Sequence, residues 1–166
     1  DLPADRRARL GMGYIPQGRD VFPDLTVHQN ITMGLSISEH KGEKLVDDVY
    51  DYFPRLDERR DQKAGTMSGG EQQMLAIGRA LAGNPDLLLL DEPSEGIQPS
   101  IVQDITDDIA SINEEFGVTV LFVEQNLQVI RELAERCYVV DGGRIEAELG
   151  ATDLEDADAV ADYLAV

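Results

Sequence analysis

Residues 86–90, DLLLL, constrain the fold of this chain more than any other segment. They follow Asn84-Pro85, a pair that breaks regular structure, and they are followed directly by DEP. A continuous apolar run of this length is typical of a strand buried on both faces, as in a parallel sheet. The run therefore predicts a central strand of an α/β core, with Asp91 and Glu92 directly after its carboxyl end.

Two further segments continue the pattern of strands. VTVLFV, residues 118–123, is apolar and rich in β-branched residues, so it predicts a second central strand. CYVV and RIEAEL flank Asp141-Gly142-Gly143, and a glycine turn between two such runs predicts a terminal hairpin. Strands that alternate with helical patterns indicate βαβ units around a parallel sheet, so the expected fold class is α/β.

Helices are predicted between and beside these strands. One begins at Pro99 and ends at Gly117, and another is capped by Asn126. The stretch from about 19 to 66 differs, because none of it reads as a buried strand, and we expect a helical insertion beside the α/β core. Its clearest helical face, ended by Pro54, consists of Val46, Val49, Tyr50 and Phe53.

The charge of the chain limits its partners. Its 33 acidic residues outnumber 14 basic ones, and the resulting net charge of −19 repels nucleic acid, so we expect no nucleic-acid partner. Acidic residues along the whole chain suggest a halophilic protein whose self-repulsion is screened by salt; an ordinary acidic surface is the alternative. The single Cys137 and two histidines, His28 and His40, exclude a disulfide framework and a Cys/His zinc site.

The acidic pair after the DLLLL strand is the first candidate for chemistry. Ligands of parallel sheets bind beyond the carboxyl ends of the strands, where Asp91 and Glu92 are predicted to lie. Two adjacent carboxylates point in different directions, so one can hold the water shell of Mg²⁺ while the other faces a reacting water, as phosphoryl transfer requires. The alternative is an acidic turn before Pro93.

MSGGEQQMLAIGRAL, residues 67–81, predicts a helix whose entrance suits an anion. Ser68 and Glu71 have the spacing of a capping box, which accounts for both residues without any ligand. Gly69 and Gly70 need another reason, because glycine in a helix costs about 1 kcal/mol against alanine. Two glycines at the positive end of a helix suggest close approach of a phosphate, although a well-capped helix remains the alternative.

A third, weaker candidate is IPQG, residues 15–18. Pro16 and Gly18 mark a turn, and Gln17 could be no more than a turn residue.

The ordered set YIPQG, MSGGEQQMLAIGRAL, LLLLDEP, SEGIQP and VLFVEQN resembles the ATP-binding subunit of an ABC transporter from its glutamine loop onward. The resemblance covers essentially the whole chain and implies a P-loop NTPase (RecA-like) core with a helical signature subdomain. It divides the chain into a core strand and glutamine loop (1–18), a helical subdomain with the signature motif (19–85), and an α/β core with a C-terminal hairpin and helix (86–166).

The resemblance also implies the residues that serve the subunit's own nucleotide, with ATP and Mg²⁺ as cofactors. Gln17 senses Mg²⁺ and the γ-phosphate, Asp91 holds Mg²⁺ through water, and Glu92 is the general base. Most relatives have a histidine at the switch position, where this chain has Gln125, which can donate a hydrogen bond to phosphate but cannot carry a proton near neutral pH. A polar residue that merely precedes the following helix is the alternative.

Other residues are implied to serve the ATP of a second subunit. Ser68, Gly69 and Gly70 form the signature motif that contacts the γ-phosphate held by the partner, with Glu71 directly after them. Ser94 and Gly96 belong to the D-loop, SEGI, which crosses the dimer interface. The helical insertion, with the glutamine loop, is implied to grip a coupling helix of a membrane permease.

Within the family, the motifs look most like subunits of branched-chain amino acid importers and their urea-importing relatives. SEGIQPSIV favours the urea branch, and the terminal YLAV favours amino acids. The implied location is the cytoplasmic face of the cell membrane. The implied partners are a second ATP-binding subunit, a permease and, indirectly, a solute-binding protein.

One family feature is missing from the sequence. No glycine is followed by lysine, so the GxxxxGK[ST] phosphate loop is absent, and the first residue is Asp1. We therefore expect either a fragment of a longer gene product, inactive by itself, or a natural truncation that acts as an interaction module without hydrolysis. A non-transport ABC ATPase is a third possibility that the acidic insertion disfavours.

Overall fold

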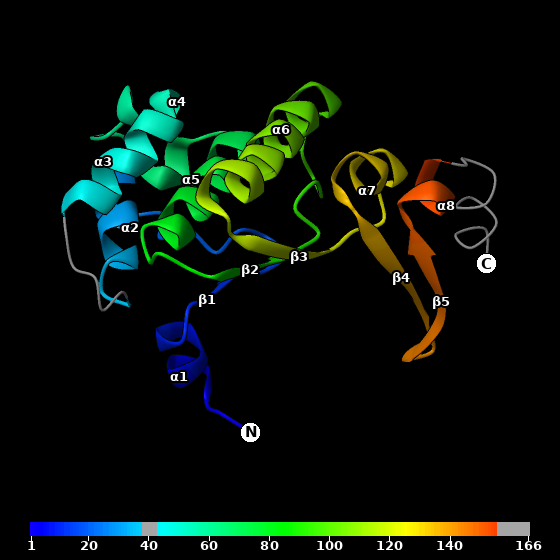
Figure 1. Ribbon diagram of the computed structural model, residues 1–166. Coiled ribbons are helices and arrows are strands. Elements are labelled where there is room, and N and C mark those ends of the chain that lie inside the picture. Colours follow the sequence, from blue (N-terminus) through cyan, green and yellow to red (C-terminus); the bar gives the residue numbers. More distant parts are fainter. Residues whose placement is uncertain (38–42, 156–166) are drawn as a thin grey trace. The chain divides into compact units, whose positions relative to one another are not determined.

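The computed structural model describes residues 1–37 and 43–155, and the chain forms two compact units, Asp1–Val123 and Glu124–Val166 (Figure 1). His40 and the terminal YLAV lie outside the described residues. The elements of the first unit are α1 (Ala4–Arg9), β1 (Met12–Ile15), α2 (Val27–Gly34), α3 (Glu43–Tyr52), α4 (Pro54–Asp57), the 3₁₀ turn η1 (Ala64–Thr66), α5 (Gly69–Leu81), β2 (Leu87–Asp91), α6 (Pro99–Phe116) and β3 (Thr119–Val123).

A parallel sheet in the order β1-β2-β3 forms the base of the first unit. Ile15 pairs with Leu90, and Asp91 pairs with Val123, so the carboxyl ends of the three strands meet at one edge. The predicted α/β class and the strand at 86–90 are confirmed, the strand being shifted by one residue.

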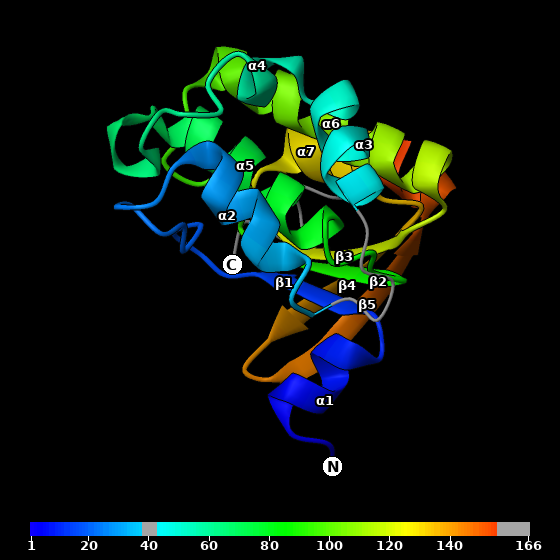
Figure 2. The same ribbon diagram turned by 90° about the vertical axis from the view of Figure 1, so that its left-hand side faces the viewer.

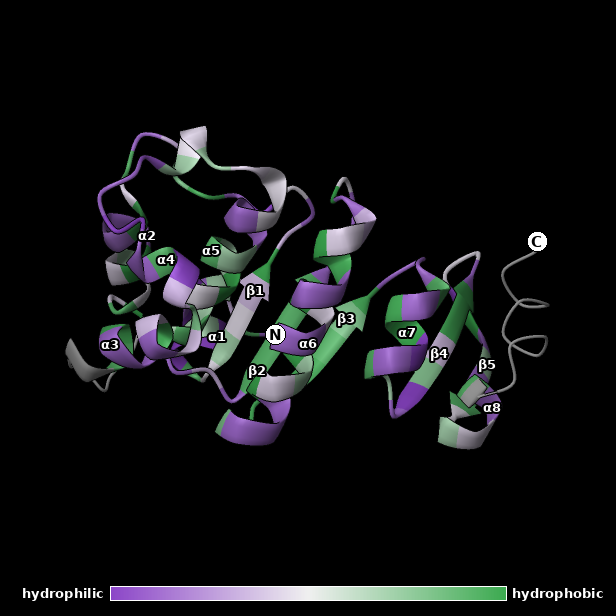
Figure 3. Ribbon diagram, turned by 90° about the horizontal axis from the view of Figure 1, so that it is seen from above, coloured by the Kyte–Doolittle hydropathy of each residue, from purple (hydrophilic) through white to green (hydrophobic). Residues whose placement is uncertain are grey.

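Burial of the sheet differs from the prediction in two respects. Leu88 and Leu90 are buried, whereas Leu87 and Leu89 are only half-buried, so the expectation of a strand buried on both faces is wrong for the described residues. Similarly, β3 is an edge strand in the described sheet instead of a central one. The half-burial of Leu87 and Leu89 follows because α2, α5 and α6 cover the same face of the sheet (Figure 2). The strands β2 and β3 are nevertheless the most apolar strands of this sheet (Figure 3).

The helical layer supplies the core of the first unit. Ile31 on α2, Leu75 and Ile77 on α5, and Ile109 and Ile112 on α6 are 0–2% exposed. As predicted, α6 begins at Pro99, and Gly117 ends it in the left-handed conformation, with φ of 65°. The layer thus fixes α5, whose first residues are the predicted signature motif, against α6.

The described residues between 19 and 66 contain helices and no named strand, as the sequence predicts, and the division of the chain into subdomains stays a prediction. The predicted apolar face is buried with 2–6% exposure: Val46, Val49 and Tyr50 lie on α3, and Phe53 directly follows it, before Pro54 begins α4. The buried amide of Asn30 anchors the segment that leads into α2: its Oδ1 accepts from the Phe22 N–H at 2.9 Å and its Nδ2 donates to the Phe22 and Thr26 carbonyls. Asn30 therefore fixes the position of the loop between β1 and α2 at its end near α2.

The second unit consists of α7 (Leu127–Leu133), β4 (Arg136–Asp141), β5 (Arg144–Gly150) and α8 (Ala151–Glu155). β4 and β5 pair antiparallel, and Gly142 and Gly143 turn between them with φ of 53° and 79°, so the predicted hairpin is confirmed. The predicted cap of α7 is also confirmed, since the Asn126 side chain accepts from the Gln128 N–H. No helix in the described part of the chain is long and apolar enough to cross a membrane.

Candidate functional site

Three predicted site residues meet at the carboxyl edge of the sheet. The Gln17 Nε2 donates to Glu92 Oε2 at 3.1 Å and to Glu95 Oε2 at 2.8 Å, across 75 and 78 residues of sequence. Asp91 lies next to Glu92 at the end of β2 and accepts a hydrogen bond from the Tyr14 hydroxyl at 3.4 Å. The parallel register of β1 and β2 brings Gln17 to the acidic pair. A residue that served only the turn would not need these contacts with carboxylates.

Glu92 has an unusual backbone. Its φ is +47°, a left-handed conformation that non-glycine residues seldom adopt. Its N–H donates to the Val123 carbonyl at 2.9 Å, and its own carbonyl accepts from the Glu95 N–H at 3.1 Å. Such conformations cost about 1 kcal/mol or more and concentrate at functional sites. The backbone of Glu92 is compatible with the predicted site, and the assignment of Asp91 and Glu92 stays a prediction.

The entrance of α5 contains the predicted capping box. The Glu71 N–H donates to Ser68 Oγ, while the Ser68 N–H and hydroxyl both donate to Glu71 Oε2 at 2.8 Å. Arg59 Nε lies 3.0 Å from the other Glu71 oxygen. The backbone N–H of Ser68, its hydroxyl and Arg59 together lower the pKa of Glu71. The carboxylate therefore stays charged and holds the first turn of the helix.

Atoms of the protein itself lie close to both glycines of the helix entrance. A Cβ at Gly70 would lie 2.5 Å from Ile101 Cγ2 on α6, and a Cβ at Gly69 would lie 3.1 Å from Arg19 Nη1. Packing against Ile101 accounts for the absence of a side chain at Gly70, and the Arg19 side chain limits the space at Gly69. The contact of the two glycines with a phosphate stays a prediction. Their place in the signature motif rests on the family pattern.

The predicted D-loop follows Glu92 as two successive turns. The Glu95 N–H donates to the Glu92 carbonyl and the Ile97 N–H donates to the Ser94 carbonyl, while Gly96 has φ of 65°. The Arg19 Nη2 donates to the Glu95 carbonyl at 2.9 Å. Sequence reasoning missed Arg19, and the available signal was its position two residues after Gln17.

Gln125 belongs to the second unit, and its place at the switch position stays a prediction. Its N–H donates to Glu124 Oε1 at 2.8 Å, directly before the Asn126 cap. His28 contributes to the helical region of the first unit, where its Nδ1 lies 3.0 Å from the Tyr50 hydroxyl.

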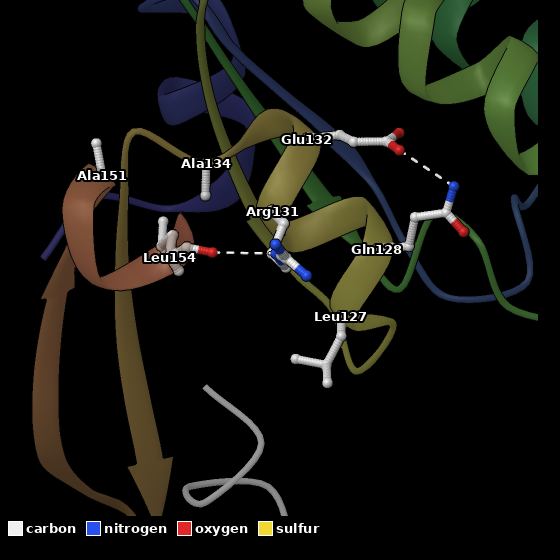
Figure 4. A pocket seen from close by; sticks show the side chains of 7 residues that line it. All are labelled: Leu127, Gln128, Arg131, Glu132, Ala134, Ala151 and Leu154. Carbon is white, nitrogen blue, oxygen red and sulfur yellow. Dashed lines mark hydrogen bonds between the residues drawn. The ribbon is translucent and has the colours of Figure 1, made fainter. Parts of the chain in front are cut away.

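An open pocket of about 620 Å³ lies between α7 and α8 (Figure 4). Its polar groups bond to one another: Arg131 Nε donates to the Leu154 carbonyl at 3.1 Å, and Gln128 Nε2 donates to Glu132 Oε1 at 3.1 Å. These bonds stabilise the second unit, and no predicted site residue lines the pocket.

The described residues contain no group of three or more His, Cys, Asp or Glu side chains that could hold a metal alone. The oxygen atoms at the edge of the sheet, from Asp91 and Gln17, suit Mg²⁺, which usually takes one or two carboxylates together with water and substrate phosphates. The residues present therefore fit this cofactor.

The fold and the site define a class. A parallel sheet with an acidic pair after its most apolar strand agrees with the core of P-loop nucleoside triphosphatases, the class to which the similar solved ATP-binding cassettes belong. The chain belongs to the ABC transporter family, because the family model described as "ABC transporter" matches residues 3–95.

Two relatives are branched-chain amino acid transport ATP-binding proteins by name. BraG of Pseudomonas aeruginosa is 50% identical over 145 residues, covering 87% of this chain and 62% of BraG. The probable LivF of Archaeoglobus fulgidus is 36% identical over 154 residues, covering 92% of this chain and 65% of LivF. The chain thus spans less than two thirds of the length of these relatives.

A solved structure supports the same conclusion about the fold. The ATP-binding cassette MJ0796, a dimer in a post-hydrolysis state bound to ADP and phosphate, has a TM-score of 0.76 and 28% identity, and the match covers 91% of this chain and 68% of MJ0796.

Proposed function

We propose that the complete protein is the ATP-hydrolysing subunit of an importer for branched-chain amino acids. It acts at the cytoplasmic face of the membrane with a second ATP-binding subunit and a permease, which receives solute from a solute-binding protein. The observation that carries the proposal is the meeting of Gln17, Asp91 and Glu92 at one edge of the sheet. The name of BraG supports the choice of solute.

Asp91 and Gln17 would hold Mg²⁺, Asp91 through water. The bound ion neutralises negative charge on the phosphates of ATP. Tyr14 supports this assignment, because its hydroxyl bonds to one oxygen of Asp91 and so restricts the orientation of the carboxylate.

Glu92 accepts the proton of the attacking water. Its bond from Gln17 fixes one carboxylate oxygen, and its left-handed backbone separates its direction from that of Asp91. A base that is positioned in this way typically contributes a factor of about 10² to 10⁴ to the rate.

Ser68, Gly69 and Gly70 serve the second nucleotide. The N–H groups of Gly69 and Gly70 and the positive helix end would face a γ-phosphate held by the other subunit, and the Ser68 hydroxyl, which donates to Glu71 in this structure, would turn to donate to that phosphate. Ser94 and Gly96 of the D-loop cross the interface beside them, and Gln125 donates to the phosphate of its own subunit. The dimeric state of MJ0796 supports this arrangement.

The solute is tested in the complete transporter reconstituted in vesicles with its solute-binding protein. Leucine or valine should stimulate ATP hydrolysis severalfold, and urea should not. Stimulation by urea alone would show that the transporter imports urea instead of amino acids. A rate of ATP hydrolysis that no solute changes would contradict a transport function.

A further inference from the structure

Arg19 lies at the junction of three segments that are far apart in sequence. Its Nη2 donates to the Glu95 carbonyl at 2.9 Å. Its guanidinium also lies against the start of α5, where a Cβ at Gly69 would be 3.1–3.3 Å from its atoms, and near Gly96, where a Cβ would be 3.6 Å from Nη2. We extend the name glutamine loop to residue 20, because the Arg19 N–H bonds to the Pro16 carbonyl in the same turn. One side chain thus connects the glutamine loop, the D-loop and the signature motif.

Glu95 is held from a second direction. Its carboxylate accepts from Gln17 Nε2 at 2.8 Å, while its carbonyl accepts from Arg19. Two residues of the glutamine loop therefore hold one D-loop residue by its side chain and by its backbone. A single bond would allow Glu95 to pivot about it, whereas two separated bonds fix its orientation as well as its position.

The backbone of the glutamine loop is strained at this junction. Arg19 and the following Asp20 have φ of 73° and 49°, in a region that non-glycine residues disfavour by about 1 kcal/mol or more each. Glycine at position 19 would avoid this cost but could not bridge to Glu95.

We propose that Arg19 and Glu95 form a clamp that makes the D-loop follow the glutamine loop. The proposal rests on the proposed function, in which the glutamine loop lies beside the permease and the D-loop crosses to the second subunit. The clamp would transmit a displacement of one loop to the other, and Glu92, whose carbonyl accepts from the Glu95 N–H, would move with them. Arg19 is a positioning residue, because its hydrogen bond is to the protein backbone.

Hydrogen exchange in the complete protein tests the clamp without any need for hydrolysis. Arg19→Gly removes the guanidinium and relieves the backbone strain, and should speed exchange of the Glu95 and Ile97 amides about tenfold, the effect of losing a charge-assisted hydrogen bond. Arg19→Lys, which keeps a charged donor, should be intermediate. Asp20→Gly is the matched control, since it relieves the neighbouring positive φ and leaves the guanidinium, and should leave exchange at 94–97 unchanged.

Coupling must also run in the opposite direction. Glu95→Ala removes the carboxylate that accepts from Gln17 and leaves the bond of Arg19 to the Glu95 carbonyl, so it should loosen the turn around Gln17 and speed exchange of the Arg19 amide, which bonds to the Pro16 carbonyl in that turn. Unchanged exchange at 94–97 in Arg19→Gly, an equal effect in Asp20→Gly, or a failure of the reciprocal effect would each overturn the clamp.

ATP turnover distinguishes positioning from direct contact with nucleotide. Arg19→Gly should lower kcat roughly tenfold or more with the KM for ATP nearly constant, because the reacting groups are displaced without loss of a ligand. A higher KM with unchanged kcat would overturn the clamp in favour of a phosphate-binding Arg19. A protein that hydrolyses no ATP would contradict the proposed function, while the exchange result would still decide on the clamp.

Discussion

At the scale of single residues, the site depends on a few side chains that each make two contacts. The Gln17 amide joins Glu92 to Glu95, and Arg19 joins Glu95 to the start of α5. Such side chains hold loops at distances that hydrophobic packing alone does not specify, because hydrogen bonds are directional. Their substitution is expected to disturb geometry before it disturbs folding.

Ser68 has a structural and a proposed chemical role, and two substitutions separate them. Ser68→Ala removes the N-cap and should lower the free energy of unfolding by about 1 kcal/mol. Ser68→Asn retains a good cap and should change stability by less than about 0.5 kcal/mol, yet it removes the hydroxyl proposed to contact phosphate. Urea denaturation and ATP turnover of both variants provide the test. If a stable Ser68→Asn protein kept full ATP turnover, Ser68 would serve only as the helix cap, and its contact with phosphate would be contradicted.

The carboxyl of Asp108 on α6 predicts a pH dependence of stability. Burial, followed by the charges of Asp104 and Asp107, raises its pKa from 3.8 to about 6. The folded protein therefore holds this proton more tightly than the unfolded chain does. The free energy of unfolding consequently falls as pH rises from about 4 to 6, and the loss is complete above that window.

Asp108→Asn should remove this loss and stabilise the protein at pH above about 6. The full pKa shift would correspond to about 3 kcal/mol, but solvent screens a half-buried carboxyl, so we expect about 1 kcal/mol. Below the unfolded-state pKa, near pH 3.5, the gain should vanish. Urea denaturation at two pH values measures the difference, and an equal gain at both would contradict the assignment.

At the scale of elements, the packing of α5 against α6 requires a glycine. A Cβ at Gly70 would lie 2.5 Å from Ile101 Cγ2, so Gly70→Ala should cost about 1–3 kcal/mol despite the better helix propensity of alanine. In an Ile101→Ala background this cost should largely disappear. Thermal denaturation of the four proteins of this cycle gives the coupling energy, and additive effects would show that the contact does not limit the packing.

Local rules predicted the elements well where one residue fixes a boundary. Pro99 and Gly117 bound α6, and Asn126 caps α7, as the sequence indicates. Burial was less predictable, since Leu87 and Leu89 are half-buried although the run DLLLL reads as fully buried. Apolar composition indicates that a strand is suited to a sheet interior, but it contains no information on which faces other elements cover.

The candidate site was predictable to a similar degree. Gln17, Asp91 and Glu92 could be proposed from their motifs, and the register of β1 with β2 brings them together. Arg19 was not proposed, because its position two residues after Gln17 is only a weak local signal and its contact with Glu95 spans 76 residues. The intramolecular contacts at Gly69 and Gly70 could not be predicted for the same reason, since the neighbouring atoms come from other segments.

At the scale of the whole molecule, charge is the dominant property. With a net charge of −19, the folded chain repels itself, and raising KCl from about 0.1 M to about 1 M shortens the screening length from about 10 Å to about 3 Å. If the surface is adapted to salt, the thermal midpoint should rise by about 3 °C or more. Sucrose at equal osmolality is the control for solute exclusion. A midpoint indifferent to KCl would contradict the halophilic proposal.

The central claim is that the complete protein hydrolyses ATP with Glu92 as the general base. The decisive measurement is the steady-state ATP turnover of the wild-type protein and of Glu92→Gln, together with ATP binding by both. Glu146→Gln, which removes an exposed carboxylate from β5, is the control and should keep wild-type turnover. We predict that Glu92→Gln lowers kcat by about 10² or more while ATP affinity is retained. Turnover close to that of the wild type in Glu92→Gln would contradict the account.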